Sequence, residues 1–345
     1  MDVLYPICCG LDVHKATITA CLRQVGRRGR VTKETRTVWL AQILQHGLLR
    51  PSLIHPAPIR ELREATRYRK QVIRARSDEA NRIQKLLEGA NLKLASVATD
   101  ILGVSGRAML AAVVRGETDA TVLARLAKGR LRPTQEQLVA ALTSRSTPVQ
   151  RTLLERQLAH AEYLDRAIAD LDAVIRTLMA PSQAEADRLR TITGIEQRTA
   201  ETLVAELGVD MAQFPSDRHC AAWAGLCPGN HESAGKRKSG KTRKGSKWLR
   251  TALTETAWAA SHTKSYLAAQ YHRIARRRGK KRTAVAVAHN LLVIAYHLLK
   301  GGTTFQDLGP DYFDRRDTRQ LQRRLIGRLE ALGLRVSVEP LPLVA

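Results

Sequence analysis

Residues 233–250 bring three serines together with many cations, and this stretch contains no acidic residue. Its three glycines allow the backbone to approach a ligand closely. Arginine and lysine neutralise a phosphodiester, and they also favour ionisation of a serine hydroxyl that attacks its phosphorus. A basic loop that binds phosphate without catalysis is the alternative. The residues concerned are Ser233, Ser239, Ser246, Lys236, Arg237, Lys238, Lys241, Arg243, Lys244, Lys247 and Arg250.

Asp12 is a candidate metal ligand near the N-terminus. It ends an apolar run in YPICCGLDVHK, and the alternating pattern of residues 5–38 predicts a three-stranded meander. A carboxylate held at the end of a buried strand suits a hard divalent cation such as magnesium. A solvated turn aspartate fits the same pattern, so the residues alone leave both interpretations open.

Two further stretches are candidates for contact with phosphate. Residues 189–208 place Gly194 between two apolar-faced helical segments, which resembles a helix-hairpin-helix whose backbone N–H groups meet a phosphate. Glu196 and Gln197 are unusual in such a hairpin, so a plain helical turn remains the alternative. Residues 271–282 hold seven arginines and lysines in twelve positions, and the candidate contacts are Arg276, Arg277, Arg278, Lys280 and Lys281.

Helical segments must position these groups. A cationic helix is predicted over 58–87, and short helices broken by glycine and proline follow over 91–147. A second long helix is predicted from apolar residues spaced by three and four, which is the pattern of a coiled-coil seam. We expect the two long helices to form an antiparallel hairpin that also dimerises the protein, and 181–188 to be a linker. The seam residues are Leu154, Leu158, Ala161, Leu164, Ile168, Leu171, Ile175 and Leu178.

Composition favours an anionic macromolecular partner. The 345 residues include 57 lysines and arginines against 32 acids, a net charge of +25, and such a field favours nucleic acid over membrane surfaces. Aromatic residues make up only 4%, which favours contact with phosphates over base stacking. We expect a cytoplasmic chain with no membrane partner, and the apolar stretch 283–302 to be a core helix.

Several motifs together resemble one family. They are GLDVHK (10–15), HGLLRPSLIHPAPIRELREATRYR (46–69), GVSGRAML (103–110), ITGIEQRTAETLVAELG (192–208) and the stretch 214–260 that includes the basic loop. Over nearly all of residues 7–315 the chain resembles the DEDD/serine transposases of insertion-sequence family one-ten. These proteins are similar to the Piv DNA invertases.

The resemblance implies an architecture and a site. It implies a RuvC-like, ribonuclease-H-like N-terminal domain whose four acids hold magnesium, a coiled-coil stalk, and an α-rich transposase domain with a serine nucleophile. It also implies oligomers and a structured bridge RNA that pairs with target and donor DNA. Asp12 matches the first acid and Ser233 matches the serine, with Ser239 and Ser246 as the other candidates.

The chain departs from this family at one join. Trp39 follows directly on Val38, where the family carries the segment with the remaining Glu, Asp and Asp of the tetrad. We therefore expect a mostly α protein with a small β portion. Its expected parts are a truncated RuvC-like domain (1–52), a coiled-coil stalk (53–185), a transposase domain with a helix-hairpin-helix-like unit (186–315) and a tail (316–345).

Three functions are compatible with these observations. The first is a transposase or site-specific recombinase whose catalysis is impaired, because one carboxylate cannot hold a magnesium pair. The second is a non-catalytic nucleic-acid binder that occupies element ends or guide RNA and represses full-length relatives. The third is a decayed gene product that folds poorly because its sheet edge is incomplete.

Overall fold

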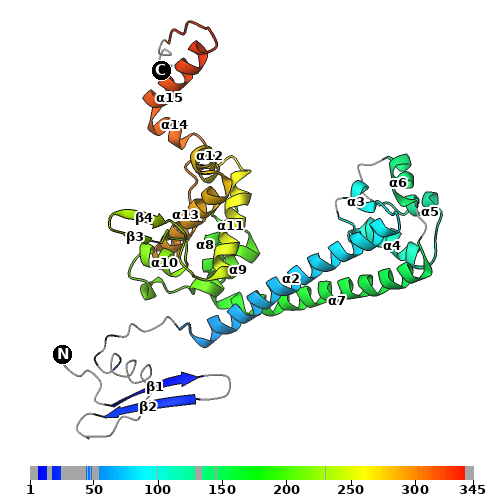
Figure 1. The fold of residues 1–345 in the computed structure, drawn as a ribbon, viewed down its shortest axis with the longest axis horizontal. Helices are drawn as coiled ribbons and strands as arrows, with labels where there is room; N and C mark the ends of the chain where they lie inside the picture. Colours follow the sequence, from blue (N-terminus) through cyan, green and yellow to red (C-terminus); the bar gives the residue numbers. More distant parts are fainter. Residues whose placement is uncertain are drawn as a thin grey trace. The chain divides into compact units, whose positions relative to one another are not determined.

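The computed structural model describes residues 7–13, 18–24, 44, 46, 48, 54–98, 100–128, 134–143, 146–229 and 231–338. The described part is mostly helical (Figure 1), as the sequence predicts. Contacts within the chain divide it into two compact units, Met1–Ile54 and His55–Ala345. The finer domain boundaries proposed from the sequence stay predictions.

The first unit contains a two-stranded antiparallel hairpin. Strands β1 (Ile7–Val13) and β2 (Ile18–Gln24) pair with Asp12 opposite Thr19. Asp12 is thus the penultimate residue of its strand, close to the predicted end. The third strand of the predicted meander, and the join between Val38 and Trp39, lie outside the described residues.

Two long helices dominate the N-terminal half of the second unit. Helix α2 (Ala57–Gly89) and helix α7 (Pro148–Met179) each begin with proline in the first turn, where no N–H is required. Thr147 and Gln150 form a capping box at the start of α7. The helices lie side by side (Figure 1), in agreement with the predicted pairing.

Ion pairs show the direction of this pairing. Arg69 binds Asp172 at 2.7 Å, Arg76 binds Asp165 at 3.1 Å, and His160 lies 3.2 Å from Glu79. The partner positions on α7 fall as those on α2 rise, so the helices are antiparallel. Leu154, Ala161, Leu164 and Ile175 of the predicted seam are buried. Supercoiling of the pair, and dimerisation through it, stay predictions.

A small group of helices covers the end of this pair at which α2 ends and α7 begins. It consists of α3 (Leu94–Val97), α4 (Val104–Val114), α5 (Ala120–Arg125) and α6 (Gln135–Leu142). Its leucines pack with Ile83 and Leu87 of α2 in one buried cluster. This group confirms the short helices expected within 91–147.

The C-terminal half of the second unit is a helical body that carries one hairpin. Its elements in chain order are η1 (Ala180–Ser182), α8 (Gln183–Arg190), α9 (Gln197–Leu207), η2 (Met211–Gln213), α10 (Asp217–Trp223), β3 (His231–Ser233), β4 (Lys236–Ser239), α11 (Lys247–Ser261), α12 (Tyr266–Arg278), α13 (Lys280–Gly301), α14 (Tyr312–Arg316) and α15 (Thr318–Glu330). The expectation of a linker over 181–188 is wrong, because η1 and α8 occupy those residues and bury Ala186.

Helix α13 is the core helix of this body, as expected. It contacts α8, α10, α11 and α12, and its Val287, Leu291 and Leu292 are fully buried. Within the described part of the chain, α13 alone has the length and apolar composition to cross a membrane, and 50% of its apolar window is buried inside the protein. This burial is what a core helix requires.

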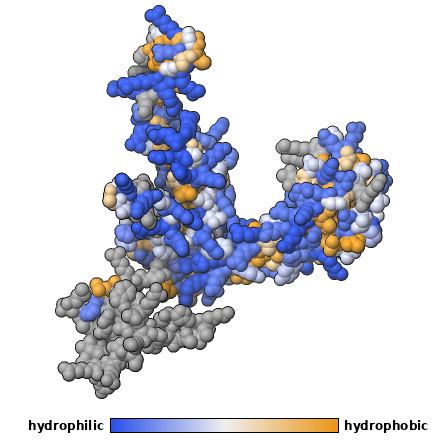
Figure 2. Space-filling view, in the orientation of Figure 1, coloured by the Kyte–Doolittle hydropathy of each residue, from blue (hydrophilic) through white to orange (hydrophobic). Residues whose placement is uncertain are grey.

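The outer surface is mainly hydrophilic on the face shown in Figure 2. The C-terminal segment is an exception, because Leu325, Leu329, Leu332 and Leu334 are exposed there. The region of interest for chemistry is therefore the polar, cationic surface around β3, β4 and the helices that hold them.

Candidate nucleic-acid interface

The predicted basic loop folds as a β-hairpin with Ser233 beside its turn. Strands β3 and β4 pair Ser233 with Lys236, and the two residues between them are Ala234 (φ 49°) and Gly235 (φ 72°). Positive φ at both central positions defines the type I′ turn, whose twist matches that of the strands. Ser233 therefore occupies the last strand position before a tight turn.

The basic stretch 233–250, which includes the hairpin, presents its functional groups to solvent. Ser233, Lys236, Lys238, Lys241, Arg243, Lys244 and Lys247 are exposed, and Arg250 is half-buried. Arg237 lies on β4 opposite Glu232, and its side chain is not described. Within the described residues none of these exposed cations forms an ion pair, which leaves them available for an external anion.

Three glycines allow close backbone contact between the basic loop and the segment 224–229 before it. The Gly229 N–H donates to the carbonyl of Lys241 at 2.9 Å. A Cβ at Gly225 would lie 2.8 Å from the carbonyl oxygen of Arg243, and one at Gly245 would lie 2.4 Å from the carbonyl of Ala224. Backbone therefore packs on backbone here, which fixes where the hairpin leaves the body.

The three loop serines have different surroundings. Ser246 caps α11 by accepting from the Leu249 N–H at 3.3 Å, and its hydroxyl donates to Glu206 at 2.8 Å. The Ser239 hydroxyl accepts from the Lys241 N–H at 3.1 Å. Within the described part of the chain, the Ser233 hydroxyl makes no such bond.

Glu206 anchors the end of the loop. Its carboxylate is almost fully buried and accepts two hydrogen bonds from Arg67 of α2, at 2.7 and 2.9 Å, besides the one from Ser246. Arg63, one turn earlier on α2, donates to the carbonyls of Ala205 and Glu206. Burial is the main cause of a lowered pKa of the Arg63 guanidinium. The sequence analysis missed Glu206, and no local pattern around it indicates a partner on α2.

Gly194 forms the turn between α8 and α9, with φ of 90°. A Cβ there would lie 3.2 Å from the carbonyl oxygen of Thr256 and 3.3 Å from Ala260, both on α11. The turn also binds a later segment, because the Thr193 hydroxyl donates to Asp307 and the Phe305 N–H donates to Thr191. Internal packing thus explains this glycine, and its contact with phosphate stays a prediction.

The second basic stretch spans the junction of α12 and α13. Arg276, Arg277 and Arg278 end α12, Gly279 turns the chain with φ of 75°, and Lys280 and Lys281 begin α13. All five cations are exposed, with no ion pair in the described region. The N-terminus of a helix carries a partial positive charge, which repels the lysine ammonium groups at the start of α13. A bound anion would relieve this repulsion, so these lysines favour binding of an external anion.

The structure describes the backbone of Asp12, within β1, but not its side chain. Within the described residues there is no group of three or more His, Cys, Asp or Glu side chains that could hold a metal ion. The ligand set that magnesium requires is therefore not assembled in this part of the chain.

Two segments of the chain match transposase families. Residues 34–92 match the DEDD transposase family of IS110, and residues 186–273 match the family described as Transposase IS116/IS110/IS902. These two segments are similar to those of IS110-family transposases. This is the family, numbered one-ten, that the sequence motifs resemble, although the DEDD match begins beyond Asp12.

Curated relatives are similar to this chain over limited lengths. The transposase for insertion sequence element IS1111A of Coxiella burnetii is 30% identical over 41% of this chain and 40% of its own length. The probable family 20 transposase of Pseudomonas aeruginosa is 32% identical over 31% of each chain. The pilin gene-inverting protein of Moraxella bovis is 31% identical over 35% of this chain and 38% of its own length. The matches span no more than two-fifths of these relatives.

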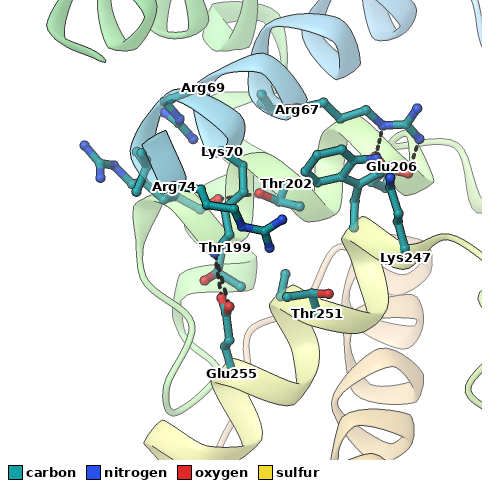
Figure 3. Close-up of a pocket in the computed structure, with 15 residues that line it drawn as sticks. Arg67, Arg69, Lys70, Arg74, Thr199, Thr202, Glu206, Lys247, Thr251 and Glu255 are labelled. Carbon is teal, nitrogen blue, oxygen red and sulfur yellow. Dashed lines mark hydrogen bonds and ion pairs between the residues drawn. The ribbon is translucent and has the colours of Figure 1, made fainter. Parts of the chain in front are cut away.

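The two matched segments meet in the structure of this chain. The DEDD-matched segment contains α2, and the second segment contains α9, the hairpin and α11. They join through Arg67 and Glu206, and a cleft lies beside this junction (Figure 3). The sequence indicates the α2 side of this cleft, because Arg67, Lys70 and Arg74 are spaced by three and four residues. Residues at this spacing lie on one face of a helix.

Proposed function

We propose that this chain is the DNA-acting protein of an insertion sequence. It binds element-end and target DNA through the basic hairpin and carries Ser233 as the nucleophile of strand exchange. The main support is the position of Ser233, exposed beside a type I′ turn and among unpaired cations, within a segment that matches transposases. Ser246 is instead occupied as a helix cap.

The proposed chemistry is a transfer of a phosphoryl group to serine and back. The Ser233 oxygen attacks a backbone phosphorus, and the bond from that phosphorus to one ester oxygen of the DNA breaks. The leaving oxygen takes up a proton, and the Ser233 hydroxyl proton is released to water. The phosphoserine ester keeps the bond energy, so a DNA hydroxyl can later attack it and restore both the strand and the serine.

We also propose that recombination by this chain is impaired. By the family resemblance four acids would hold magnesium, and the motifs supply a match only for Asp12. The DEDD match covers residues 34–92 and does not include Asp12. Guidance by a structured RNA, and oligomers formed through α2 and α7, belong to the same proposal.

Covalent trapping tests the serine and the impairment together. We expect no adduct on a denaturing gel after the protein is mixed with element-end DNA, the adjacent RNA and magnesium, because the metal site lacks its ligands. Ser233→Ala and Ser239→Ala are run beside the parent. An adduct that only Ser233→Ala abolishes would contradict the impairment and support Ser233 as the nucleophile. An adduct that only Ser239→Ala abolishes would contradict both the impairment and the choice of serine.

DNA binding gives a separate prediction for the hairpin. Replacing Lys236 and Lys238 by glutamine is expected to weaken binding to duplex DNA about tenfold, and to lower the slope of log K against log salt by about two. The matched control replaces Lys85 and Lys264, two exposed lysines elsewhere, by glutamine. Equal affinity of the two double variants would remove the hairpin from the interface.

A non-catalytic binder is the second candidate function. The unmatched acid tetrad favours it, since binding through Lys and Arg requires no metal. Such a protein would occupy element ends or guide RNA and repress full-length relatives. Binding without any adduct, together with a biological effect that Ser233→Ala leaves unchanged, would favour this candidate over a catalytic one.

A further inference from the structure

A cleft of about 290 Å³ lies between α2, α9 and α11, beside the Arg67–Glu206 junction, and it shares Lys247 with the basic stretch 233–250. Figure 3 shows Lys70 and Arg74 reaching from α2 toward Thr251 and Glu255 of α11. Its size suits a phosphate with part of its sugar better than a large cofactor. Its cations are Arg67, Arg69, Lys70, Arg74, Arg198 and Lys247, and its acids are Glu206 and Glu255.

Several of these cations already have partners. Arg69 pairs with Asp172 and Glu201, at 2.7 and 2.6 Å, and its side chain is only 4% exposed. Arg198 binds the other oxygen of Asp172 at 2.8 Å. Burial opposes ionisation of Asp172, but both arginines donate to it and hold the pKa of this carboxyl below its usual value. Arg69 and Arg198 are therefore held in place by acids of the protein itself and are not available to a ligand.

The remaining cations are available to a ligand. Arg74 and Lys247 are exposed and have no ion pair within the described residues. The Lys247 ammonium lies 5.1 Å from the centre of the Trp248 ring, which restricts its position near the cleft. Lys70 pairs with Glu255 at 2.9 Å, but the two side chains are 41% and 58% exposed, so this pair is weak and a ligand can replace Glu255.

Neutral donors line the same space. Thr199 of α9 and Thr251 of α11 face the cleft, and within the described region neither hydroxyl makes a hydrogen bond. Cations together with free hydroxyls on opposite walls are the donor set that a phosphate oxygen requires. Lys247 directly follows Ser246, which ends the basic loop, so this loop leads directly into the lining of the cleft.

We infer that this cleft binds a backbone phosphate of a nucleic-acid strand, as a second anchor besides the hairpin. Arg74 and Lys247 hold the anion, with Lys70 joining them when it leaves Glu255, and Thr199 and Thr251 donate hydrogen bonds. The inference rests on the proposed function, because it requires nucleic acid at the hairpin. The shared phosphodiester of DNA and RNA is the ligand, and the experiment separates the two sources.

The test uses the full chain carrying Arg74→Gln and Lys247→Gln. Binding to fluorescent duplex DNA and to single-stranded RNA, both of random sequence, is measured from low to moderate salt. Loss of two phosphate contacts is expected to weaken binding to at least one of these probes about tenfold. The slope of log K against log salt for that probe should fall by about two. The probe whose binding is weakened shows whether DNA or RNA occupies the cleft.

Controls keep the cleft and the hairpin apart. The Lys85→Gln and Lys264→Gln double variant loses the same charge, and Arg74→Lys combined with Lys247→Arg retains it. We expect parental binding from both controls, with unchanged thermal midpoints for all three proteins. If the cleft variant keeps parental affinity and slope on both probes while the hairpin variant is weakened, the cleft inference is overturned and the proposed function stands. If the parent binds neither probe, the proposed function itself fails.

Discussion

Glu206→Ala is expected to lower the free energy of unfolding by about 3 kcal/mol. The carboxylate is 2% exposed and accepts three hydrogen bonds, two from Arg67 and one from Ser246. Its removal leaves a guanidinium and a hydroxyl without their acceptor. Arg67 is 36% exposed, so partial rehydration keeps the loss below that of a fully buried pair. Urea unfolding of the full chain measures it.

Two variants separate the buried junction from the ordinary surface. Glu206→Gln retains one acceptor oxygen and should lose about half as much as Glu206→Ala. Glu255→Ala breaks the exposed pair with Lys70 and should change stability by less than about 1 kcal/mol. If Glu206→Ala and Glu255→Ala lower the free energy of unfolding equally, the buried Arg67–Glu206 junction stabilises the protein no more than an exposed ion pair does.

The junction also shows why sequence reasoning missed part of the site. Arg67 and Glu206 are separated by 139 positions, and neither belongs to a local pattern that indicates the other. Side chains at such separations meet only once the helices pack. The basic loop, in contrast, could be located from local composition alone, but its strands β3 and β4 were not predicted. Its type I′ turn was not evident, because Ala234 adopts a φ that favours glycine or asparagine.

Helices were predicted better than their connections. Apolar spacing over 58–87 and 154–178 predicts α2 and α7, because burial of one face determines where a helix lies. The error at 181–188 has a physical reason. Pro181 and polar residues indicated a linker, but proline is tolerated in a first turn, and Arg188 pairs with Glu185 at 3.3 Å along the helix.

Gly245→Ala is expected to destabilise the protein by about 3 kcal/mol and to weaken DNA binding through the hairpin. The added methyl group would lie 2.4 Å from the carbonyl of Ala224 and 2.5 Å from the Gly225 nitrogen. Both neighbours are backbone, so the loop must move away from the body. That movement displaces Ser246 from Glu206 and shifts the hairpin cations.

Gly327→Ala in α15 is the matched control, because its Cβ meets nothing within 4 Å and alanine favours a helix. It should unfold at the parental urea concentration or slightly above, with unchanged affinity for DNA. A Gly245→Ala protein that matches this control in both measurements would show that the loop has room to relax. The hairpin would then be positioned by the Ser246 cap and Glu206 alone, and a Ser246→Ala variant should lose the DNA affinity that Gly245→Ala retains.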